Sequence, residues 1–421
     1  MFSINEQLNR IKEFRLRLNN QPEENLPLPV KRIAQSIKNI DKTKNRLQKN
    51  TFKKNKEVSI NSIIIKPVGI RCNLGCTYCS AETTRKRKGC PEGKMSLRLI
   101  ERLILQIDKY LQGHILLYWQ GGEPLLAGVD FYKQVVEMQK DILRNNKNVM
   151  VVNLIQTNAT LLNEDWINFF KKSYFGVTIS LDGSELDHNL SRKYIDSRGS
   201  YNDVIHSVQL LRRSGIKVGA TATISPLHSR NPKEFIESFI KAGISSVHIR
   251  HCYDKDLLLT PLQYADFIIE LFDAWLNTDC EIEFSIFKDI FLRLLNRKSA
   301  FCYNNGVCGS YPAVEVNGDV WLCDESFTNK NYLWGNINKT NFIDMMKSKK
   351  YKDFCRIKQR VYKKCFLNCE WFIFCFGDCL YHYTIGTKKE LIGDKNYYCE
   401  GLRKIYEYIV YKINRIMEGK L

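Results

Sequence analysis

The stretch Cys72-Asn73-Leu74-Gly75-Cys76-Thr77-Tyr78-Cys79 places three cysteines within eight residues, at the spacing C-x3-C-x2-C. Three thiolates from one short loop can bind three irons of a [4Fe–4S] cluster and leave the fourth iron open to a small chelating molecule. Zinc is the alternative, because zinc sites share the C-x2-C spacing and need a fourth ligand, which Cys90 or His114 could supply. This stretch therefore predicts a metal centre.

Strands and helices alternate regularly after this loop, and the strand Ser59–Lys66 comes just before it. The other expected strands are His114–Trp119, Asn148–Gln156, Phe175–Ser180, Lys217–Ile224 and Ser246–His251, and the expected helices are Ser96–Leu111, Asp130–Leu143, Asn163–Lys172, Asn202–Ser214 and Pro232–Ala242. Such βα alternation predicts a parallel sheet with right-handed crossovers. We therefore expect an α/β fold built on a partial (β/α)6 TIM-like barrel.

Polar and glycine-rich segments follow four of these strands. The cysteine loop follows the first strand, Gly121-Gly122-Glu123-Pro124 the second and Thr157-Asn158 the third, and Ser180-Leu181-Asp182-Gly183 ends the fourth. Functional residues of such barrels lie at the C-terminal ends of the strands. These segments are therefore expected to form one active-site rim.

The C-x3-C-x2-C loop after the first barrel strand resembles the radical S-adenosylmethionine superfamily, over roughly residues 58–255. The resemblance implies that Cys72, Cys76 and Cys79 hold a cluster whose open iron binds S-adenosylmethionine. It implies cleavage of this cofactor to a 5′-deoxyadenosyl radical that takes a hydrogen atom from the substrate. The implied cofactor residues are Tyr78 at the adenine, Gly121, Gly122 and Glu123 at the methionyl amine, Asn158 and Ser180 at the ribose or substrate, and Arg192 at the cofactor carboxylate.

A second group of eight cysteines lies between residues 302 and 399, the number that two four-thiolate clusters need, although two structural zinc sites remain an alternative. Their spacing resembles the SPASM extension of the superfamily. The resemblance implies one auxiliary [4Fe–4S] cluster on Cys302, Cys308, Cys323 and Cys379, and another on Cys365, Cys369, Cys375 and Cys399. Three residues separate Cys365 from Cys369, where the family usually has two. Cys90, Cys252, Cys280 and Cys355 are expected to be ordinary core or surface residues.

Asp324 directly follows Cys323. The pair resembles a Cys-Asp pair of anaerobic sulfatase maturases, in which the aspartate takes a proton from the substrate. Peptide maturases that form carbon–carbon crosslinks can also carry an aspartate here. The resemblance implies a catalytic Asp324, and a solvated turn residue is the alternative.

The chain is expected to divide into five parts: a basic, partly helical N-terminal extension (1–57), the partial barrel (58–255), a helical linker (256–300), a cysteine-rich SPASM domain with two auxiliary clusters (301–400) and a C-terminal helix (401–421).

The composition of the 421-residue chain limits its location and partners. No segment approaches the roughly 18 consecutive apolar residues of a membrane span, and the first residues do not resemble a signal peptide. We therefore expect a cytoplasmic protein whose 15 cysteines are reduced. The net charge of +19 fits solvated lysines or an acidic partner. Nothing but this charge points to nucleic acid, so we expect neither a nucleic acid nor a membrane as partner.

The leading hypothesis is a maturase of a ribosomally made precursor peptide, with an acidic leader as one possibility. It would form an intramolecular carbon–carbon crosslink of the cyclophane type, because residues 120–132 resemble cyclophane-forming maturases as well as sulfatase maturases. The alternatives are formylglycine formation on a sulfatase, thioether formation, epimerisation and a non-catalytic iron–sulfur electron carrier. The resemblance also implies a low-potential electron donor, flavodoxin or ferredoxin.

Overall fold

The computed structural model describes residues 31, 60–79, 91, 93–228, 231–278, 282–295, 299, 301–324, 330–387 and 392–417. The predicted extension 1–57 lies outside this part of the chain except for residue 31, and so do Cys90 and Cys280. None of the described helices is long and apolar enough to cross a membrane.

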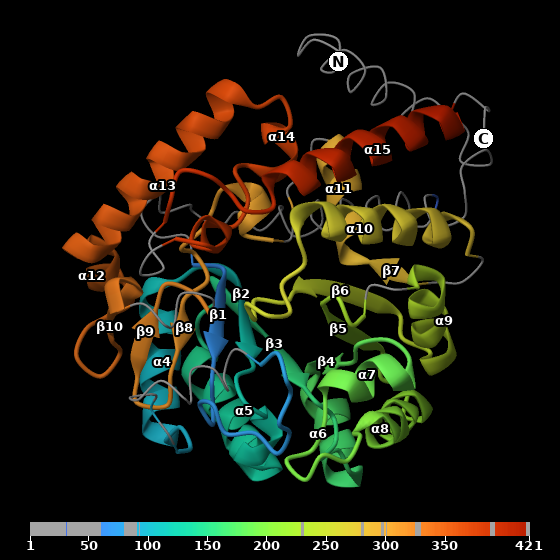
Figure 1. Cartoon of the computed structure of the whole chain (residues 1–421). Helices are drawn as coiled ribbons and strands as arrows, with labels where there is room; N and C mark the ends of the chain where they lie inside the picture. The colour runs from blue at the N-terminus through green and yellow to red at the C-terminus, as the bar shows by residue number, and fades with distance from the viewer. Residues whose placement is uncertain are drawn as a thin grey trace.

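One sheet runs through both halves of the protein, in the order β10-β9-β8-β1-β2-β3-β4-β5-β6-β7. Its centre consists of six parallel strands, β1 (Ser62–Ile65), β2 (Gly113–Trp119), β3 (Val149–Thr157), β4 (Gly176–Ser180), β5 (Val218–Ile224) and β6 (Ser246–His251). The predicted partial (β/α)6 barrel is confirmed, and Figure 1 shows its curved sheet with helices on the outside.

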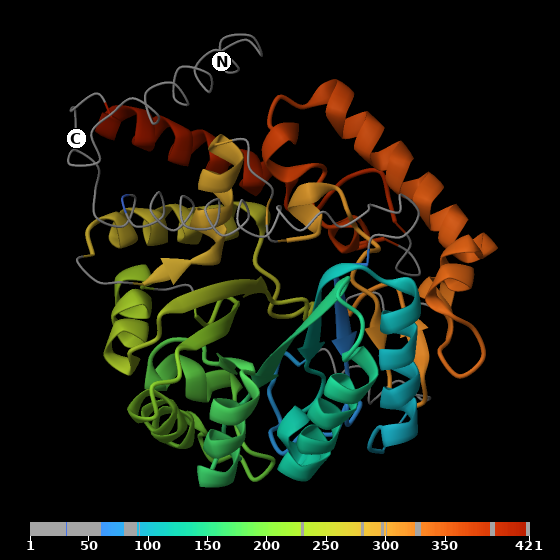
Figure 2. The same cartoon turned by 180° about the vertical axis from the view of Figure 1, so that it is seen from behind.

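The crossover helices between these strands are α4 (Leu97–Tyr110), α5 (Val129–Leu143), α6 (Glu164–Ser173), α8 (Tyr201–Arg213) and α9 (Pro232–Ala242). Three of them begin at a side-chain cap, because Ser96, Asn163 and Asn231 each accept a backbone N–H of the first turn. The view from behind in Figure 2 shows α4, α5 and α6 along the outer face of the sheet.

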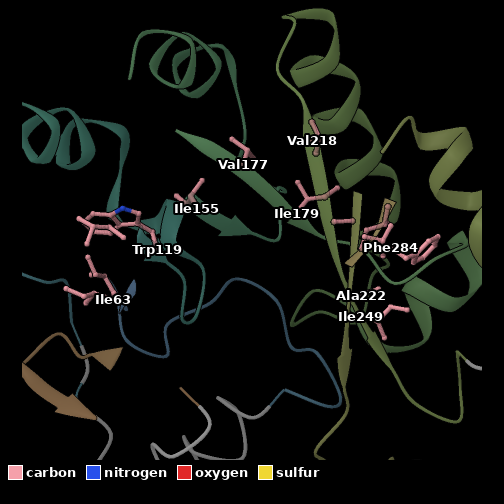
Figure 3. Packing of buried hydrophobic residues seen from close by; sticks show 14 of the residues in the cluster. Ile63, Trp119, Ile155, Val177, Ile179, Val218, Ala222, Ile249 and Phe284 are labelled. Carbon is pink, nitrogen blue, oxygen red and sulfur yellow. The ribbon is translucent and has the colours of Figure 1, made fainter. Parts of the chain in front are cut away.

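The core lies between the sheet and these helices. All four residues of β1 are buried, as expected for a strand of a parallel sheet covered on both faces. Ile63, Trp119, Ile155 and Ile179 come from four successive strands and are all fully buried (Figure 3).

The sheet extends beyond the six predicted strands on both sides. On one side β7 (Glu283–Phe284) pairs with β6, and on the other β8 (Ala313–Val314) pairs with β1, both in parallel. Two antiparallel strands, β9 (Asp319–Trp321) and β10 (Leu333–Asn336), complete the second side. Two-residue strands are too short to show an alternating pattern, which is why the sequence did not predict β7 and β8.

The C-terminal half contains helices in the predicted helical linker and further helices beyond it. Helices α10 (Pro261–Leu276) and α11 (Ser285–Leu294) lie in the predicted linker, and α10 packs against α15 (Cys399–Met417). The predicted SPASM domain contains α12 (Phe342–Lys347), α13 (Lys349–Asn368) and α14 (Phe372–Cys375), three helices that the sequence did not predict. Of the α13 residues only Phe354 and Val361 are buried, so an apolar helical period was hard to recognise there.

Candidate active site

The cysteine loop follows β1 and is hydrogen-bonded to the segment that follows β4 and α7 (Glu185–Ser191). Gly75 donates its N–H to the Lys193 carbonyl oxygen at 2.8 Å, just after α7, a helix that the sequence did not predict. Leu74 N–H and the Asn158 side-chain amide donate to the Cys72 sulfur at 3.4 and 3.7 Å. The loop is therefore held at the C-terminal ends of the strands, where the sequence placed it.

The three thiols of this loop fit a cluster. Burial raises the pKa of Cys72 to about 11 and that of Cys76 to about 12, and Cys79 acts electrostatically on both. Bound iron would supply the positive charge that turns such buried thiols into thiolates. Within the described residues, no three His, Cys, Asp or Glu side chains are grouped to hold a single metal ion. Cubane ligands bind separate irons, so a cluster on Cys72, Cys76 and Cys79 does not require such a single-ion group.

The Gly121-Gly122-Glu123-Pro124 segment lies directly on the backbone of the cysteine loop. Gly122 and Glu123 donate their N–H groups to the carbonyl oxygens of Gly69 and Arg71 at 2.8 and 2.7 Å. A Cβ atom on Gly122 would lie 1.9 Å from the Arg71 oxygen, so only glycine permits this approach. Gly121 has a φ of +128°, which also favours glycine.

Glu123 is fully buried and joins the ends of β2 and β3. Its carboxylate accepts the Thr157 hydroxyl at 2.7 Å and the N–H groups of Asn158 and Leu125 at 2.7 and 2.9 Å. Burial raises the pKa of Glu123 to about 7, although these three donors act in the opposite direction. The carboxylate thus binds donors of its own chain, and its implied contact with the methionyl amine stays a proposal.

Tyr78 and Arg192 both contact Asp182, a residue of the expected rim for which the sequence predicted no role of its own. The Asp182 carboxylate accepts two hydrogen bonds from the Arg192 guanidinium, at 2.8 and 3.2 Å, and one from the Tyr78 hydroxyl. The guanidinium also lies 5.4 Å from the centre of the Tyr78 ring. Asp182 is fully buried, and Arg192 holds its pKa at about 2 although burial acts to raise it.

Arg192 and Ser180, two of the implied cofactor residues, both lie close to Asp182. Arg192 is paired with a carboxylate of its own chain, so its implied contact with the cofactor carboxylate remains a proposal. Ser180, the last residue of β4, is buried two residues before Asp182. The structure therefore gathers the predicted rim residues, and their roles toward S-adenosylmethionine stay predictions.

Asp324 lies in a second polar group at the same end of the barrel. Its carboxylate pairs with the Lys66 ammonium at 2.8 Å and accepts a hydrogen bond from the Gln120 amide at 3.1 Å. Lys66 also pairs with the buried Glu315 at 3.0 Å. Burial acts to raise the pKa of Asp324, but the charges of Lys66 and Arg250 hold it below its ordinary value. The ion pair with Lys66 thus favours the charged form of the Asp324 carboxylate.

The sequence missed Lys66, Gln120, Asp182, Arg250 and Glu315. Lys66, Gln120 and Asp182 follow barrel strands by one or two residues, and Arg250 is close to the end of its strand. Selecting every polar residue at a predicted strand end would have found these four. Glu315 follows β8, a two-residue strand that the sequence did not predict, so no pattern pointed to this residue.

The thirteen described cysteines are all free. Electrostatic interactions that raise thiol pKa values, in addition to burial, join Cys302, Cys308, Cys323 and Cys379. Similar interactions join Cys365, Cys369, Cys375 and Cys399. The structure thus brings together the same two groups that the resemblance implied. Cys252 is buried and Cys355 is half-buried on α13. Their expected role as ordinary core or surface residues stays a prediction.

Comparison with protein families gives two matches. Residues 67–242 match the family described as the radical SAM superfamily, where SAM is S-adenosylmethionine. Residues 307–370 match SPASM, described as an iron–sulfur cluster-binding domain.

Comparison with curated proteins gives sulfatase-maturating relatives of two types. The cysteine-type anaerobic sulfatase-maturating enzyme of Clostridium perfringens is 28% identical over 82% of this chain and 95% of its own length. The serine-type anaerobic sulfatase-maturating enzyme of Bacteroides thetaiotaomicron is 28% identical over 82% of this chain and 89% of its own.

Comparison with solved structures gives similar folds, two of which are described here. The structure described as native anSMEcpe with bound AdoMet (S-adenosylmethionine) has a TM-score of 0.77 at 27% identity, covering 85% of this chain and 99% of that one. The Streptococcus suis SuiB structure with precursor peptide SuiA has a TM-score of 0.58 at 16% identity, covering 87% and 81%. At that identity the second likeness shows the fold alone.

Proposed function

Because the chain is a radical S-adenosylmethionine enzyme with an iron–sulfur SPASM domain, we propose that it converts a cysteine or serine side chain of a substrate protein into formylglycine. The observation that carries this proposal is the similarity to sulfatase-maturating enzymes of both types over four fifths of the chain. The Asp324 carboxylate, held by Lys66 and Gln120 directly after Cys323, supports it.

This proposal replaces the crosslinking activity that the sequence favoured. The relatives at 28% identity are sulfatase-maturating enzymes, whereas the likeness to SuiB concerns the fold alone. The motif of residues 120–132, common to sulfatase maturases and cyclophane-forming maturases, could not separate the two activities.

The proposed reaction is a two-electron oxidation, which can be balanced for a cysteine. One hydrogen atom leaves Cβ, one proton leaves the thiol, one further electron leaves the side chain, and water then adds its oxygen while sulfur departs as hydrogen sulfide. When bound, the clusters and S-adenosylmethionine supply the radical that removes the hydrogen atom and accept the further electron. Asp324 would accept the proton, because its carboxylate is the acceptor that Lys66 and Gln120 hold in place directly after Cys323.

Other residues of the chain would shape the cofactor site. We propose Cys72, Cys76 and Cys79 as ligands of the cofactor-binding cluster and the two later groups of four cysteines as ligands of the auxiliary clusters. Tyr78 and Arg192, fixed by Asp182, would form one wall of the site, and the backbone of residues 121–123 another. The partner is a peptide segment of the substrate protein. Reduced thiols fit the cytoplasmic location that the sequence predicts.

The test uses the anaerobically reconstituted enzyme with S-adenosylmethionine, dithionite and a sulfatase-derived peptide carrying cysteine, or serine, at the target position. We expect 5′-deoxyadenosine and a peptide aldehyde that reacts with a hydrazine reagent. A peptide that has lost two hydrogens without gaining an aldehyde would instead indicate a crosslink. If a fully loaded enzyme produces no 5′-deoxyadenosine with either peptide, the proposal is wrong.

Asp324 can be tested separately with the variant Asp324→Asn, which keeps the shape of the side chain. We expect 5′-deoxyadenosine formation to continue while aldehyde formation falls by about 10²-fold or more, the usual contribution of a general base. Asp344→Asn removes a carboxylate from α12 and serves as the matched control. Equal aldehyde yields from the two variants would exclude Asp324 as the base.

A further inference from the structure

Helix α13 presents a row of basic side chains to solvent. Lys349, Lys352, Arg356, Arg360 and Lys363, called here the α13 stripe, are all exposed and recur every three or four residues. This spacing places them on one face of the helix, while Phe354 and Val361 are buried on the other face. In Figures 1 and 2 the helix lies at the edge of the molecule, away from the barrel helices α5, α6 and α8.

Helix α13 carries a large excess of positive charge, and only a few of its basic side chains are engaged in the contacts described next. Residues 349–368 contain eight Lys or Arg and one Asp, a net charge of +7. Lys350 and Lys358 turn toward the protein and donate to backbone carbonyl oxygens, Lys358 to Cys308 at 3.0 Å. Arg356 pairs with Asp353 on the helix surface. The α13 stripe therefore forms a strongly positive surface that attracts acidic partners.

The stripe ends in exposed apolar side chains beside the second cysteine group. Phe366 and Leu367 are 66% and 65% exposed, which is unusual for large apolar residues in a folded domain. Cys365 and Cys369 flank them in sequence, and Cys399 of the same group is itself exposed. A partner seated on the end of α13 would thus reach the proposed cluster ligands nearest to the surface.

We propose that the α13 stripe, together with Phe366 and Leu367, is the docking surface for an acidic one-electron donor protein of the flavodoxin or ferredoxin class. A cluster on Cys365, Cys369, Cys375 and Cys399 would receive the electron, so the inference rests on the proposed function and its cluster ligands. One electron leaves the reduced donor and the cluster gains it, and no bond is formed or broken. A basic stripe that ends in two exposed apolar side chains suits a transient redox contact, which is small and electrostatically steered.

The experiment compares two double charge reversals in the reconstituted holoenzyme. Lys352→Glu/Lys363→Glu changes the stripe, and Lys171→Glu/Lys172→Glu changes two exposed lysines of α6, which lies at the opposite end of the molecule in Figure 1. Stopped-flow absorbance measures cluster reduction by a reduced acidic flavodoxin and, separately, by dithionite. We expect flavodoxin to reduce the stripe variant about tenfold more slowly than the wild type at low salt, with little difference at high salt. The α6 variant should match the wild type, and dithionite should reduce all three equally.

Carbodiimide crosslinking supplies a readout that does not depend on activity. Mass spectrometry should map crosslinks from flavodoxin carboxylates to Lys352 and Lys363. The docking proposal is overturned by equal flavodoxin rates in both variants, by crosslinks confined to the barrel, or by a wild-type enzyme that flavodoxin does not reduce. It is also overturned if the stripe variant loses affinity for the substrate peptide instead, since the surface would then bind substrate.

The proposed function is tested independently, with dithionite as the reductant. An enzyme that shows stripe-dependent reduction but makes no formylglycine refutes the proposed function alone. An enzyme that makes formylglycine with dithionite, and whose reduction by flavodoxin does not depend on the stripe, refutes the docking surface alone.

Discussion

Replacing Asp182 by asparagine removes the negative charge at the centre of the group formed by Tyr78, Asp182 and Arg192. Asp182 is fully buried and accepts four hydrogen bonds: two from Arg192, one from the Tyr78 hydroxyl and one from the Thr223 N–H at 2.9 Å. In Asp182→Asn the guanidinium becomes a buried charge without a counter-ion, and an amide NH₂ faces its N–H donors.

Removing one partner of a buried ion pair costs about 3–5 kcal/mol, and we expect Asp182→Asn to lose at least about 3 kcal/mol of the free energy of unfolding. The double variant Asp182→Asn/Arg192→Met removes both charges. It should be more stable than the single variant, because replacing a whole buried pair costs far less than breaking it. Asp187→Asn, whose half-buried carboxylate accepts only local bonds from Ser184, is the matched control and should lose less than about 1 kcal/mol.

The assay is urea unfolding of the anaerobic holoenzyme, followed by circular dichroism and by cluster absorbance. S-adenosylmethionine affinity is measured beside it, and should weaken in Asp182→Asn because Tyr78 and Arg192 lose their common anchor. An unfolding free energy of Asp182→Asn within about 0.5 kcal/mol of the wild type would refute the reasoning. A double variant less stable than the single one would refute it equally, since the buried charge would then not be the cause.

Three further predictions concern other parts of the site. In Gly122→Ala the new Cβ would lie 1.9 Å from the Arg71 oxygen, so the variant should lose iron content and thermal stability. Gly75→Ala is the control, because its new Cβ would make only an ordinary contact of 3.9 Å. Iron analysis and differential scanning fluorimetry measure the two properties. Burial lowers the pKa of His188 from 6.5 to about 3, so between these values the unfolded chain binds a proton that the native chain does not. Stability should therefore fall as the pH drops below 6.5, and His188→Met should reduce the slope by up to about 1.4 kcal/mol per pH unit in urea titrations; an unchanged slope would exclude His188 as its source. Iron chelation should lower the thermal midpoint and iron with sulfide should restore it, because bound clusters join distant segments; an apo-enzyme as stable as the holoenzyme would contradict this.

The central barrel could be predicted from the sequence because its strands are long and mostly buried. Strands of four to nine residues alternate with amphipathic helices from Ser62 to His251. The apolar patterns of these strands and helices are therefore long enough to be recognised in the sequence. The two-residue strands β7 and β8 have no readable period, and only pairing with β6 and β1 makes them strands. Helix α13 was missed because eight of its twenty residues are basic and few are apolar.

The candidate site was predictable to the extent that its residues carry a distinctive spacing. The cysteines could be selected from their spacing, and electrostatic interactions link the thiols within each of the two later groups. Their role as cluster ligands stays a prediction. Lys66 and Asp182 escaped selection because a single charged residue at a strand end has no spacing of its own. Their importance appears only in the fold. There Lys66 pairs with Asp324, which is distant in sequence, and Asp182 pairs with Arg192, which follows another element.

The pairing of β8 with β1 has a consequence for engineering this enzyme. Ile64 and Ile65 share a backbone register with Ala313 and Val314, so the edge of the barrel is closed by residues that follow the predicted boundary at residue 300. A chimera that exchanged everything beyond that boundary would expose the buried strand β1 as a free, aggregation-prone edge. It would also replace Asp324 while keeping its partner Lys66. A transplantable unit therefore has to carry β8, β9 and β10 together with the barrel. It also has to keep the later segment that contains Cys379, because that thiol is grouped with Cys302, Cys308 and Cys323.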